Sequence, residues 1–207
     1  TEVTQWQETW LSPSIASYRP DMGCHDLWWA QTLETEHALL HDLARGGVSL
    51  DFAKAFDFLP IEILFGIARS MGFSQAVLAP LEGMHRQLVR RFKVGPFVGE
   101  GFLSTNGILQ GCPLSVGLLN MFIQVWVNAV KSEVPQARPR AYADDVSATA
   151  DHPRHIKAVV KLTAEFAEMT GMQINADKSH VWGTTEAFRL ALVGLTIAGC
   201  QCHSLGK

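Results

Sequence analysis

The sequence predicts an α+β fold built on an antiparallel sheet. Two observations favour it: strand candidates come in hairpins instead of alternating strictly with helices, and long amphipathic segments lie between them. The chain has 207 residues, of which 47% are hydrophobic and 18% charged, so it can bury a sizeable core. The sequence has no internal repeat and no dividing linker, which indicates one domain, or one domain with subdomains.

Turn residues and hydrophobic periodicity define the expected elements. Glycines end the helices, a proline opens one of them, and short β-branched runs mark the strands. In chain order we expect an irregular lead-in with tryptophans, a helix over 27–44, a strand over 48–52, helices over 60–72 and 74–89, a hairpin through Gly95-Pro96, helices over 114–130 and 153–170, and strands around Ile174, Val181 and 195–198.

The segment LSVGLLNMFIQVWVNAV, residues 114–130, is the most membrane-like part of the chain. It falls short of the roughly 20 apolar residues that a bilayer span needs. Asn120, Gln124 and Asn128 recur every four residues, so they draw one polar stripe along a helix. The pattern predicts a buried helix whose stripe faces something polar, and no contact with a membrane.

Composition restricts partners and compartment. The net charge is -3, which argues mildly against nucleic-acid binding unless local patches carry it. The four cysteines are scattered, without a CxxC pair, so neither a disulfide framework nor a structural metal is expected. No basic region followed by an apolar run begins the sequence, so we expect an intracellular protein, nuclear or cytoplasmic. His152 and His155 are expected to be surface or capping residues.

Three aspartates carry the chemistry. Asp144 and Asp145 form an Asp-Asp turn between the apolar runs of AYADDVSA, although the pair alone also fits a polar hairpin turn. Asp51 ends the strand GVSLD. If the hairpin lies beside that strand, three carboxylates converge, an arrangement suited to hard cations. Two Mg²⁺ ions roughly 3.5–4 Å apart activate an attacking hydroxyl and stabilise the leaving oxygen of a phosphoryl displacement.

Four segments resemble a known family. VSLDFAKAFD, GILQGCPLS, AYADD and GMQINADKS resemble, in order, four motifs of the reverse transcriptase superfamily. The likeness is strongest to non-LTR (LINE-type) retrotransposon enzymes, with group II intron enzymes next. It runs from SYRPDMG, near residue 15, to HSLGK, which resembles the primer-grip hairpin.

The resemblance implies a right-hand polymerase palm with an antiparallel sheet and flanking helices, partial fingers and no thumb. Residues 1–45 would form the lead-in and partial fingers, and 46–185 the palm. The helices and hairpin of 60–105 would contribute to fingers and palm, and 186–207 would begin the primer-grip hairpin.

The resemblance also implies roles for matching residues. Asp51, Asp144 and Asp145 would be catalytic and hold two Mg²⁺ ions, or Mn²⁺ in their place. Phe56 would be the aromatic gate that collides with a 2′-hydroxyl, and Lys178 would stabilise the leaving pyrophosphate. The residues expected to bind the nucleotide are Phe52, Phe56, Gln110, Gly111 and Lys178. By themselves, Phe56 also fits a core phenylalanine, Gln110 a loop-bonding residue and Lys178 a surface lysine.

The remaining charged residues of these segments have more modest expected roles. Asp57 is expected to form an ion pair or cap a helix, and Lys54 to lie on the exposed side of its motif in a structural or backbone-contacting role. A basic cluster either contacts nucleic-acid phosphates or is only a solvated face. Its members are Arg86, Arg90, Arg91 and Lys93.

These observations favour RNA-directed DNA polymerisation, with an RNA template, a DNA primer and dNTPs as partners and an undetermined oligomeric state. The chain would be a fragment of a larger polyprotein or a decayed insertion. One alternative is a reverse transcriptase-like domain of the maturase type that binds RNA without polymerising. Another is a metal-dependent phosphotransferase or nuclease on a different fold, which leaves LQGCPLS and Phe56 unexplained.

Overall fold

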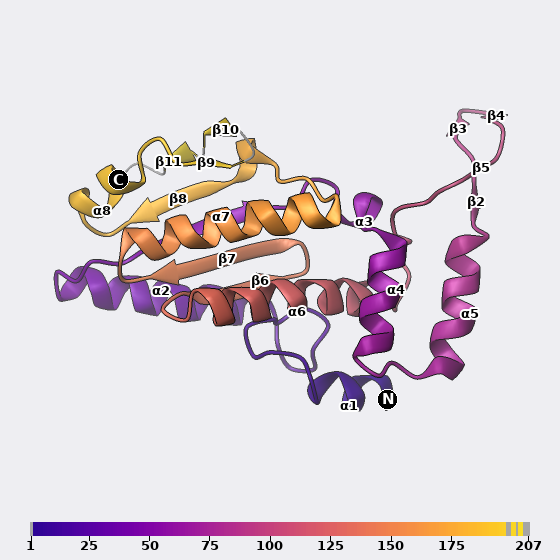
Figure 1. The fold of residues 1–207 in the computed structure, drawn as a ribbon, viewed down its shortest axis with the longest axis horizontal. Helices are drawn as coiled ribbons and strands as arrows, with labels where there is room; N and C mark the ends of the chain where they lie inside the picture. The colour runs from indigo at the N-terminus through magenta and orange to yellow at the C-terminus, as the bar shows by residue number, and fades with distance from the viewer. Residues whose placement is uncertain (1, 198–199, 202, 205–207) are drawn as a thin grey trace.

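The computed structural model describes residues 2–197, 200–201 and 203–204 (Figure 1). The helices are α1 (Glu2–Glu8), α2 (Cys24–Leu40), α3 (Ala55–Phe58), α4 (Ile61–Ser70), α5 (Gln75–Arg86), α6 (Ser115–Glu133), α7 (Pro153–Thr170), α8 (Glu186–Leu192) and the 3₁₀ turn η1 (Ala176–Lys178). The strands are β1 (Gly46–Asp51), β2 (Val89–Arg90), β3 (Lys93–Val94), β4 (Phe97–Val98), β5 (Phe102–Leu103), β6 (Arg138–Tyr142), β7 (Asp145–Ala150), β8 (His180–Gly183), β9 (Thr196–Ile197), β10 (Cys200–Gln201) and β11 (His203–Ser204).

A five-stranded sheet in the order β11-β8-β1-β7-β6 forms the centre of the molecule. The central strand β1 runs antiparallel to both β7 and β8, and β6 runs antiparallel to β7. The lead-in covers the outer edge of β6, because Ala141 exchanges backbone hydrogen bonds with Ser14 and Ala16 at 2.8 and 3.1 Å. The predicted antiparallel sheet is confirmed for β6, β7, β1 and β8, whereas the short strand β11 runs parallel to β8. The lead-in closes the β6 edge to further strand pairing.

The two faces of the sheet differ in polarity, as alternation along a strand requires. On one face Val48, Leu50, Val146 and Ala148 are buried against the layer of α6 and α7. The other face carries the side chains that alternate with them, including Ser49 and the two facing aspartates of β1 and β7. Figure 1 shows α6 and α7 in front of the sheet and α2 behind it.

The polar stripe of α6 faces the backbone of the lead-in. Asn120 is fully buried, its Nδ2 donates to the Ser17 carbonyl at 2.7 Å, and its Oδ1 accepts from the Ser17 hydroxyl at 2.6 Å. One turn later, Gln124 Oε1 accepts the Ser12 amide at 2.7 Å. The predicted stripe is confirmed, and its partner is the irregular chain that approaches the site.

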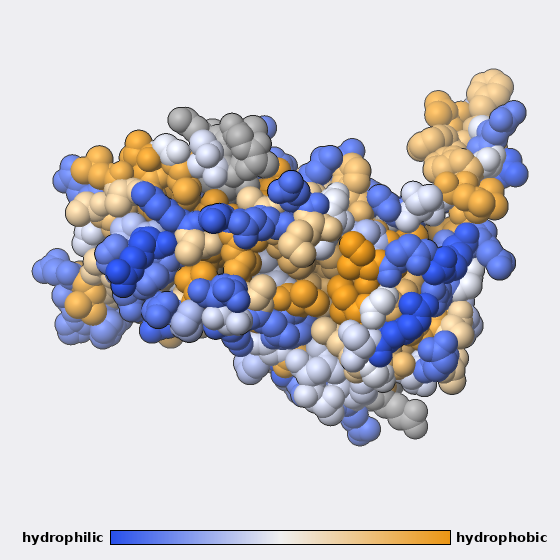
Figure 2. Space-filling view, viewed as in Figure 1, coloured by the Kyte–Doolittle hydropathy of each residue, from blue (hydrophilic) through white to orange (hydrophobic). Residues whose placement is uncertain are grey.

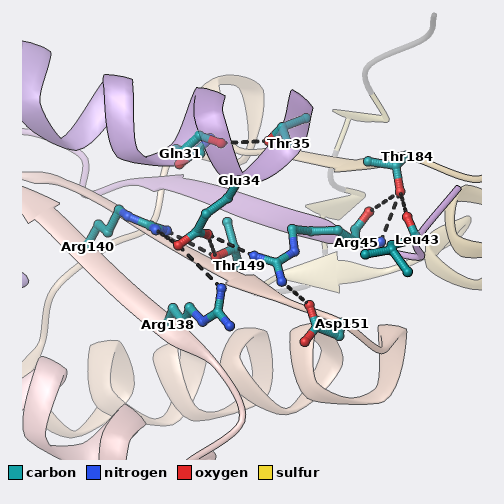
Figure 3. A network of polar contacts seen from close by, with 10 residues as sticks. All are labelled: Gln31, Glu34, Thr35, Leu43, Arg45, Arg138, Arg140, Thr149, Asp151 and Thr184. Atoms are coloured by element: carbon teal, nitrogen blue, oxygen red, sulfur yellow. Dashed lines mark hydrogen bonds and ion pairs between the residues drawn. The ribbon is translucent and has the colours of Figure 1, made fainter. Parts of the chain in front are cut away.

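A charged network attaches α2 to the polar face of the sheet (Figure 3). The Glu34 carboxylate forms ion pairs with Arg140 at 2.7 Å, Arg45 at 3.0 Å and Arg138 at 3.3 Å. It also accepts a hydrogen bond from Thr149 Oγ1 at 3.4 Å. Desolvation by burial pushes the pKa of Glu34 upward, but Arg140, with Arg138 and Arg45, holds it below its ordinary value. These ion pairs of Glu34 therefore hold α2 against the polar face of the sheet.

Some elements differ from the sequence-based expectations. Helices α1 and α8 form where no helix was expected. They give little signal in the sequence, because each is only seven residues long and lacks a full amphipathic repeat. Ile174 forms only an isolated bridge to Phe52. Helix α7 matches its predicted bounds, and His152 caps it by accepting the Arg154 amide at 3.1 Å. Residue 198 of the last expected strand and residues 205–207 of HSLGK lie outside the described residues.

No helix in the described residues is both long enough and apolar enough to cross a membrane.

Candidate active site

The sheet register places Asp51 directly opposite Asp145. The pairing of β1 with β7 runs from Gly46 opposite Ala150 to Asp51 opposite Asp145, so the two carboxylates stand on the same face. Side chains that face one another across an antiparallel pair have Cβ atoms roughly 5 Å apart. Two segments 94 residues apart in sequence (145 − 51) thus bring their aspartates together at one end of the sheet.

Asp144 lies in the turn of the β6–β7 hairpin. The hairpin is confirmed, but the last pair is Tyr142 with Asp145, so its two-residue turn is Ala143-Asp144 and not the expected Asp144-Asp145. Ala143 takes the left-handed conformation, with φ of 53°, that opens such a tight turn. As a result Asp145 begins a strand, while Asp144 lines a cavity beside it.

The three carboxylates act on one another electrostatically. Partial desolvation raises the pKa of Asp145 although its side chain is exposed, and the negative charges of Asp144 and then Asp51 raise it further. Lys178 lowers the same pKa. The carboxylates therefore repel one another, and a cation among them would relieve the repulsion.

Lys178 is held near the aspartates by backbone contacts with the end of β1. The Asn175 amide donates to the Asp51 carbonyl at 2.8 Å, and the Ala53 amide donates to the Gln173 carbonyl at 2.8 Å. In addition, the Asp51 amide approaches the Ser179 hydroxyl at 3.4 Å. The GMQINADKS segment is thus tied directly to the strand that carries Asp51.

An open cavity of about 620 Å³ lies beside the aspartates. Phe56, Gln110, Gly111 and Asp144, predicted as site residues from three separate motifs, all line it. Gly111 has a φ of 86°, a conformation that favours glycine in the loop that enters α6. The structure therefore brings together the predicted gate, the predicted nucleotide loop and one predicted metal ligand.

The loop before Gln110 is anchored to the segment that carries Phe56. Gly107 donates to the Leu59 carbonyl at 2.8 Å, and Ile108 donates to the Phe56 carbonyl at 2.7 Å. Gly107 has a φ of 86°, and a Cβ atom there would lie 2.6 Å from the Asp57 carbonyl oxygen. Only glycine fits this close approach, which keeps the loop before Gln110 against the segment that carries Phe56.

Several residues of the cavity lining were not identified as site residues from the sequence, and three of them carry polar side chains that matter for the site. Tyr18 and Lys54 line the cavity, and both have left-handed backbone conformations, with φ of 57° and 47°. Lys54 is exposed as predicted, but it faces the cavity and supplies a positive charge there. Ser115 also lines it, and its buried hydroxyl has no hydrogen-bond partner in the described residues, which suits a polar ligand. The positive φ values have no signal in the sequence.

Two predictions are not supported by the positions of the side chains. Phe52 is 1% exposed and packs in the core near Phe166, with ring centroids 6.4 Å apart, so its ring does not face the cavity. Asp57 is exposed and, within the described residues, its carboxylate forms neither the expected ion pair nor a helix cap. It lies in the first turn of the short helix α3, which has no side-chain cap hydrogen bond.

The basic cluster is divided in the structure. Arg86 forms ion pairs with Glu62 and Glu82 at 2.7 and 2.8 Å, so it belongs to the α4–α5 surface. Arg90 donates to the Gly107 carbonyl at 3.2 Å, and Arg91 donates to the Gly99 carbonyl at 3.4 Å. A phosphate-contacting role for Arg90, Arg91 and Lys93 stays a prediction.

The donors present suit divalent cations by type. Asp51, Asp144 and Asp145 offer carboxylate oxygens, which hard cations such as Mg²⁺ prefer. Within the described part of the chain, however, no three His, Cys, Asp or Glu side chains are gathered closely enough to hold an ion. The three side chains share one electrostatic field without forming a closed ligand set.

The antiparallel sheet with two helices on one face and a carboxylate hairpin at its end defines an α+β polymerase palm. A model of the family described as "Reverse transcriptase (RNA-dependent DNA polymerase)" matches residues 3–194. The chain therefore belongs to the reverse transcriptase family.

Relatives from non-LTR retrotransposons confirm the predicted branch. The chain is 24% identical over 177 residues to the Pol polyprotein of the type-2 retrotransposable element R2DM of Drosophila melanogaster, covering 83% of this chain and 17% of the relative. It is 26% identical over 155 residues to a 149 kDa protein of transposon TX1 of Xenopus laevis, covering 68% and 12%. The chain thus spans less than a fifth of either relative.

Solved structures support the fold independently. Telomerase from Candida tropicalis, in complex with a TWJ fragment of telomeric RNA, superposes with a TM-score of 0.66 at 12% identity. That match covers 86% of this chain and 32% of the telomerase chain. Telomerase from Candida albicans gives 0.63 at 11% identity, covering 87% and 34%. At this identity the likeness shows a shared fold.

Proposed function

We propose that this chain is the palm of an RNA-directed DNA polymerase of a non-LTR retrotransposon, which adds dNTPs to a primer 3′-hydroxyl on an RNA template. The register of Asp51 opposite Asp145, with Asp144 in the adjoining turn, carries the proposal. An open cavity of about 620 Å³, lined by Asp144, lies beside these carboxylates and would receive the nucleotide. We place the protein inside the cell, where its template and substrates are.

The chain's residues would act mainly by positioning and charge. Asp51, Asp144 and Asp145 would hold two Mg²⁺ ions, or Mn²⁺, which supply charge stabilisation for in-line phosphoryl transfer. The positive charge of Lys178 lowers the pKa of Asp145. The same charge would offset negative charge on the leaving pyrophosphate. Phe56 would form the wall under the sugar and exclude a 2′-hydroxyl.

One alternative has an observation in its favour. Because the described carboxylates form no closed ligand set, a catalytically silent domain of the maturase type would also fit. Such a domain binds RNA and has no need of dNTPs. A nuclease on an unrelated fold no longer fits, since the chain belongs to the reverse transcriptase family.

Binding of dNTP separates the two functions. The full natural protein is loaded with an RNA template and a chain-terminated DNA primer, and dNTP affinity is measured with Mg²⁺ and with EDTA. We expect binding at least about tenfold tighter with Mg²⁺, since the carboxylates would hold the ions and the ions would supply positive charge for the phosphates. Asp144→Asn should lose this Mg²⁺ effect, whereas Asp57→Asn, an exposed aspartate with no side-chain partner in the described residues, should keep it. Stable RNA binding without any Mg²⁺-dependent dNTP binding would contradict the proposal and favour the silent domain.

A further inference from the structure

Residues 89–103 form a hairpin that projects from the body of the molecule, and we call it the arm. Its root is the pair β2–β5, with Val89 opposite Leu103, and its tip is the pair β3–β4, with Lys93 opposite Val98. Gly95 turns the tip with a φ of 57°. Figure 1 shows the arm extending beyond α5, away from the central sheet.

The arm exposes an unusual amount of apolar side chain. Phe92 is 72% exposed and Phe97 77% exposed, and Phe92 stacks on Phe102 with ring centroids 5.2 Å apart. Figure 2 shows the arm as a largely hydrophobic projection with hydrophilic residues among the apolar ones. The exposed apolar residues are Val89, Phe92, Val94, Phe97, Val98, Phe102 and Leu103. A contiguous surface of this kind marks a binding site.

The charge of the arm indicates the chemistry of its partner. It carries Arg90, Arg91 and Lys93 against Glu100, so its net charge is 3 − 1 = +2, although the whole chain is at -3. Within the described residues neither Arg91 nor Lys93 pairs with a carboxylate. Aromatic faces interleaved with unpaired cations are the combination that binds single-stranded nucleic acid, by stacking bases and contacting phosphates.

The root of the arm is joined to the candidate active site. Arg90 donates to the Gly107 carbonyl at 3.2 Å, and Gly107 is anchored to Leu59. Gly107 is only four positions after Leu103, a reach of at most roughly 14 Å. A single-stranded nucleic acid bound along the arm would therefore lead toward the side of the cavity that Gln110 lines.

We propose that the arm is a docking surface for the unpaired, single-stranded part of the template. Phe92 and Phe97 would stack on its bases, and Arg91 and Lys93 would contact its phosphates. Arg90 instead holds the arm's root to the active-site loop. This inference rests on the proposed function in taking the strand to be a template, but the surface itself is defined by the arm alone.

The test measures binding of a fluorescein-labelled 20-nucleotide oligo(U) RNA to the full natural protein by fluorescence anisotropy. The buffer contains EDTA and no dNTP, so that neither metal nor nucleotide contributes. We expect Phe97→Ala to weaken binding about tenfold, because stacking on one base is lost. Lys93→Gln should reduce the salt dependence by about one phosphate contact. Both side chains are exposed, so neither change should affect folding. Leu40→Ala, at an 82% exposed leucine of α2, is the matched control and should bind as the wild type does.

Two further measurements make the outcome decisive. A blunt RNA duplex has no free base faces, so its binding should be insensitive to Phe97→Ala. Because the assay contains neither metal nor dNTP, its result does not depend on the proposed catalysis, which separates failure of the arm from failure of the catalytic proposal. Unchanged oligo(U) affinity in Phe97→Ala would overturn the proposal. The proposal would also be overturned if Phe97→Ala changed only the self-association of the protein, measured by gel filtration, because the arm would then be a protein–protein interface.

Discussion

At the scale of single residues, backbone geometry places the chemistry. Asp51 and Asp145 face one another because of strand register, and Asp144 reaches the cavity because Ala143 takes a left-handed conformation. The opposite wall depends on Gly107, whose close approach to Asp57 leaves no room for a side chain. Small changes in the backbone would therefore separate groups that must act together.

Gly107→Ala should destabilise the protein by at least about 2 kcal/mol, because it adds the cost of a left-handed alanine to a steric clash. Denaturant unfolding measures the effect. Gly66→Ala is the matched control: it lies inside α4, and a Cβ atom there meets nothing within 4 Å. That change should raise stability by about 0.5–1 kcal/mol. Equal effects from the two changes would contradict the account of the loop.

The positions of site residues were predictable where a motif carried them. The three aspartates, Phe56 and Gln110 were identified from the sequence, and the last two line the cavity with Asp144. The positions of Tyr18 and Lys54 in the cavity lining were not predictable, since both depend on left-handed conformations for which their residue types give no signal. The hairpin turn was placed one residue late, because Asp is a more typical turn residue than Ala143.

At the scale of elements, α2 is secured to the polar face of the sheet by one carboxylate. Glu34→Gln should lower the free energy of unfolding by about 2 kcal/mol at pH 7, since Arg140 is buried and would lose its charged partner. Glu165→Gln, which removes an exposed pair with Lys161 at 3.7 Å, should change it by less than about 0.5 kcal/mol.

The pH dependence of the Glu34 effect has a definite sign. The pKa of Glu34 is lower in the folded chain than its ordinary value of 4.5, so the carboxylate's contribution is complete above that value. The contribution is lost as the pH falls through the folded-state pKa. The stability difference between wild type and Glu34→Gln should therefore shrink below pH 4.5. A difference that persists unchanged at low pH would show that charge is not its cause.

Long elements were predictable, and their contacts were not. The periodicity of α7 gave its bounds, and the stripe of α6 showed that a polar partner existed. The seat of α2 was not predictable, because its apolar residues do not gather on one face and the partners of Glu34 lie on β6, β7 and the segment before β1. Short α1 and α8 depend on tertiary packing more than on local pattern.

At the scale of the whole molecule, the aspartate end of the sheet lies beside the cavity, and the root of the projecting arm is joined to the cavity loop. β1 and β7 end in the facing aspartates, the loop from Gly107 to Gly111 forms the cavity wall, and the arm joins that same loop through Arg90. The antiparallel palm was predictable through its ordered motifs. The direction of the arm was not, because a hairpin sequence does not specify how it leaves the body.

RNA-templated primer extension tests the central claim most directly. The full natural protein, Asp144→Asn and Asp57→Asn are compared at equal concentration, with circular dichroism to establish that each is folded. We predict Mg²⁺-dependent extension by the wild type, a loss of roughly 1000-fold in Asp144→Asn, and activity within about twofold of wild type in Asp57→Asn. Extension by Asp144→Asn at the wild-type rate would contradict the account.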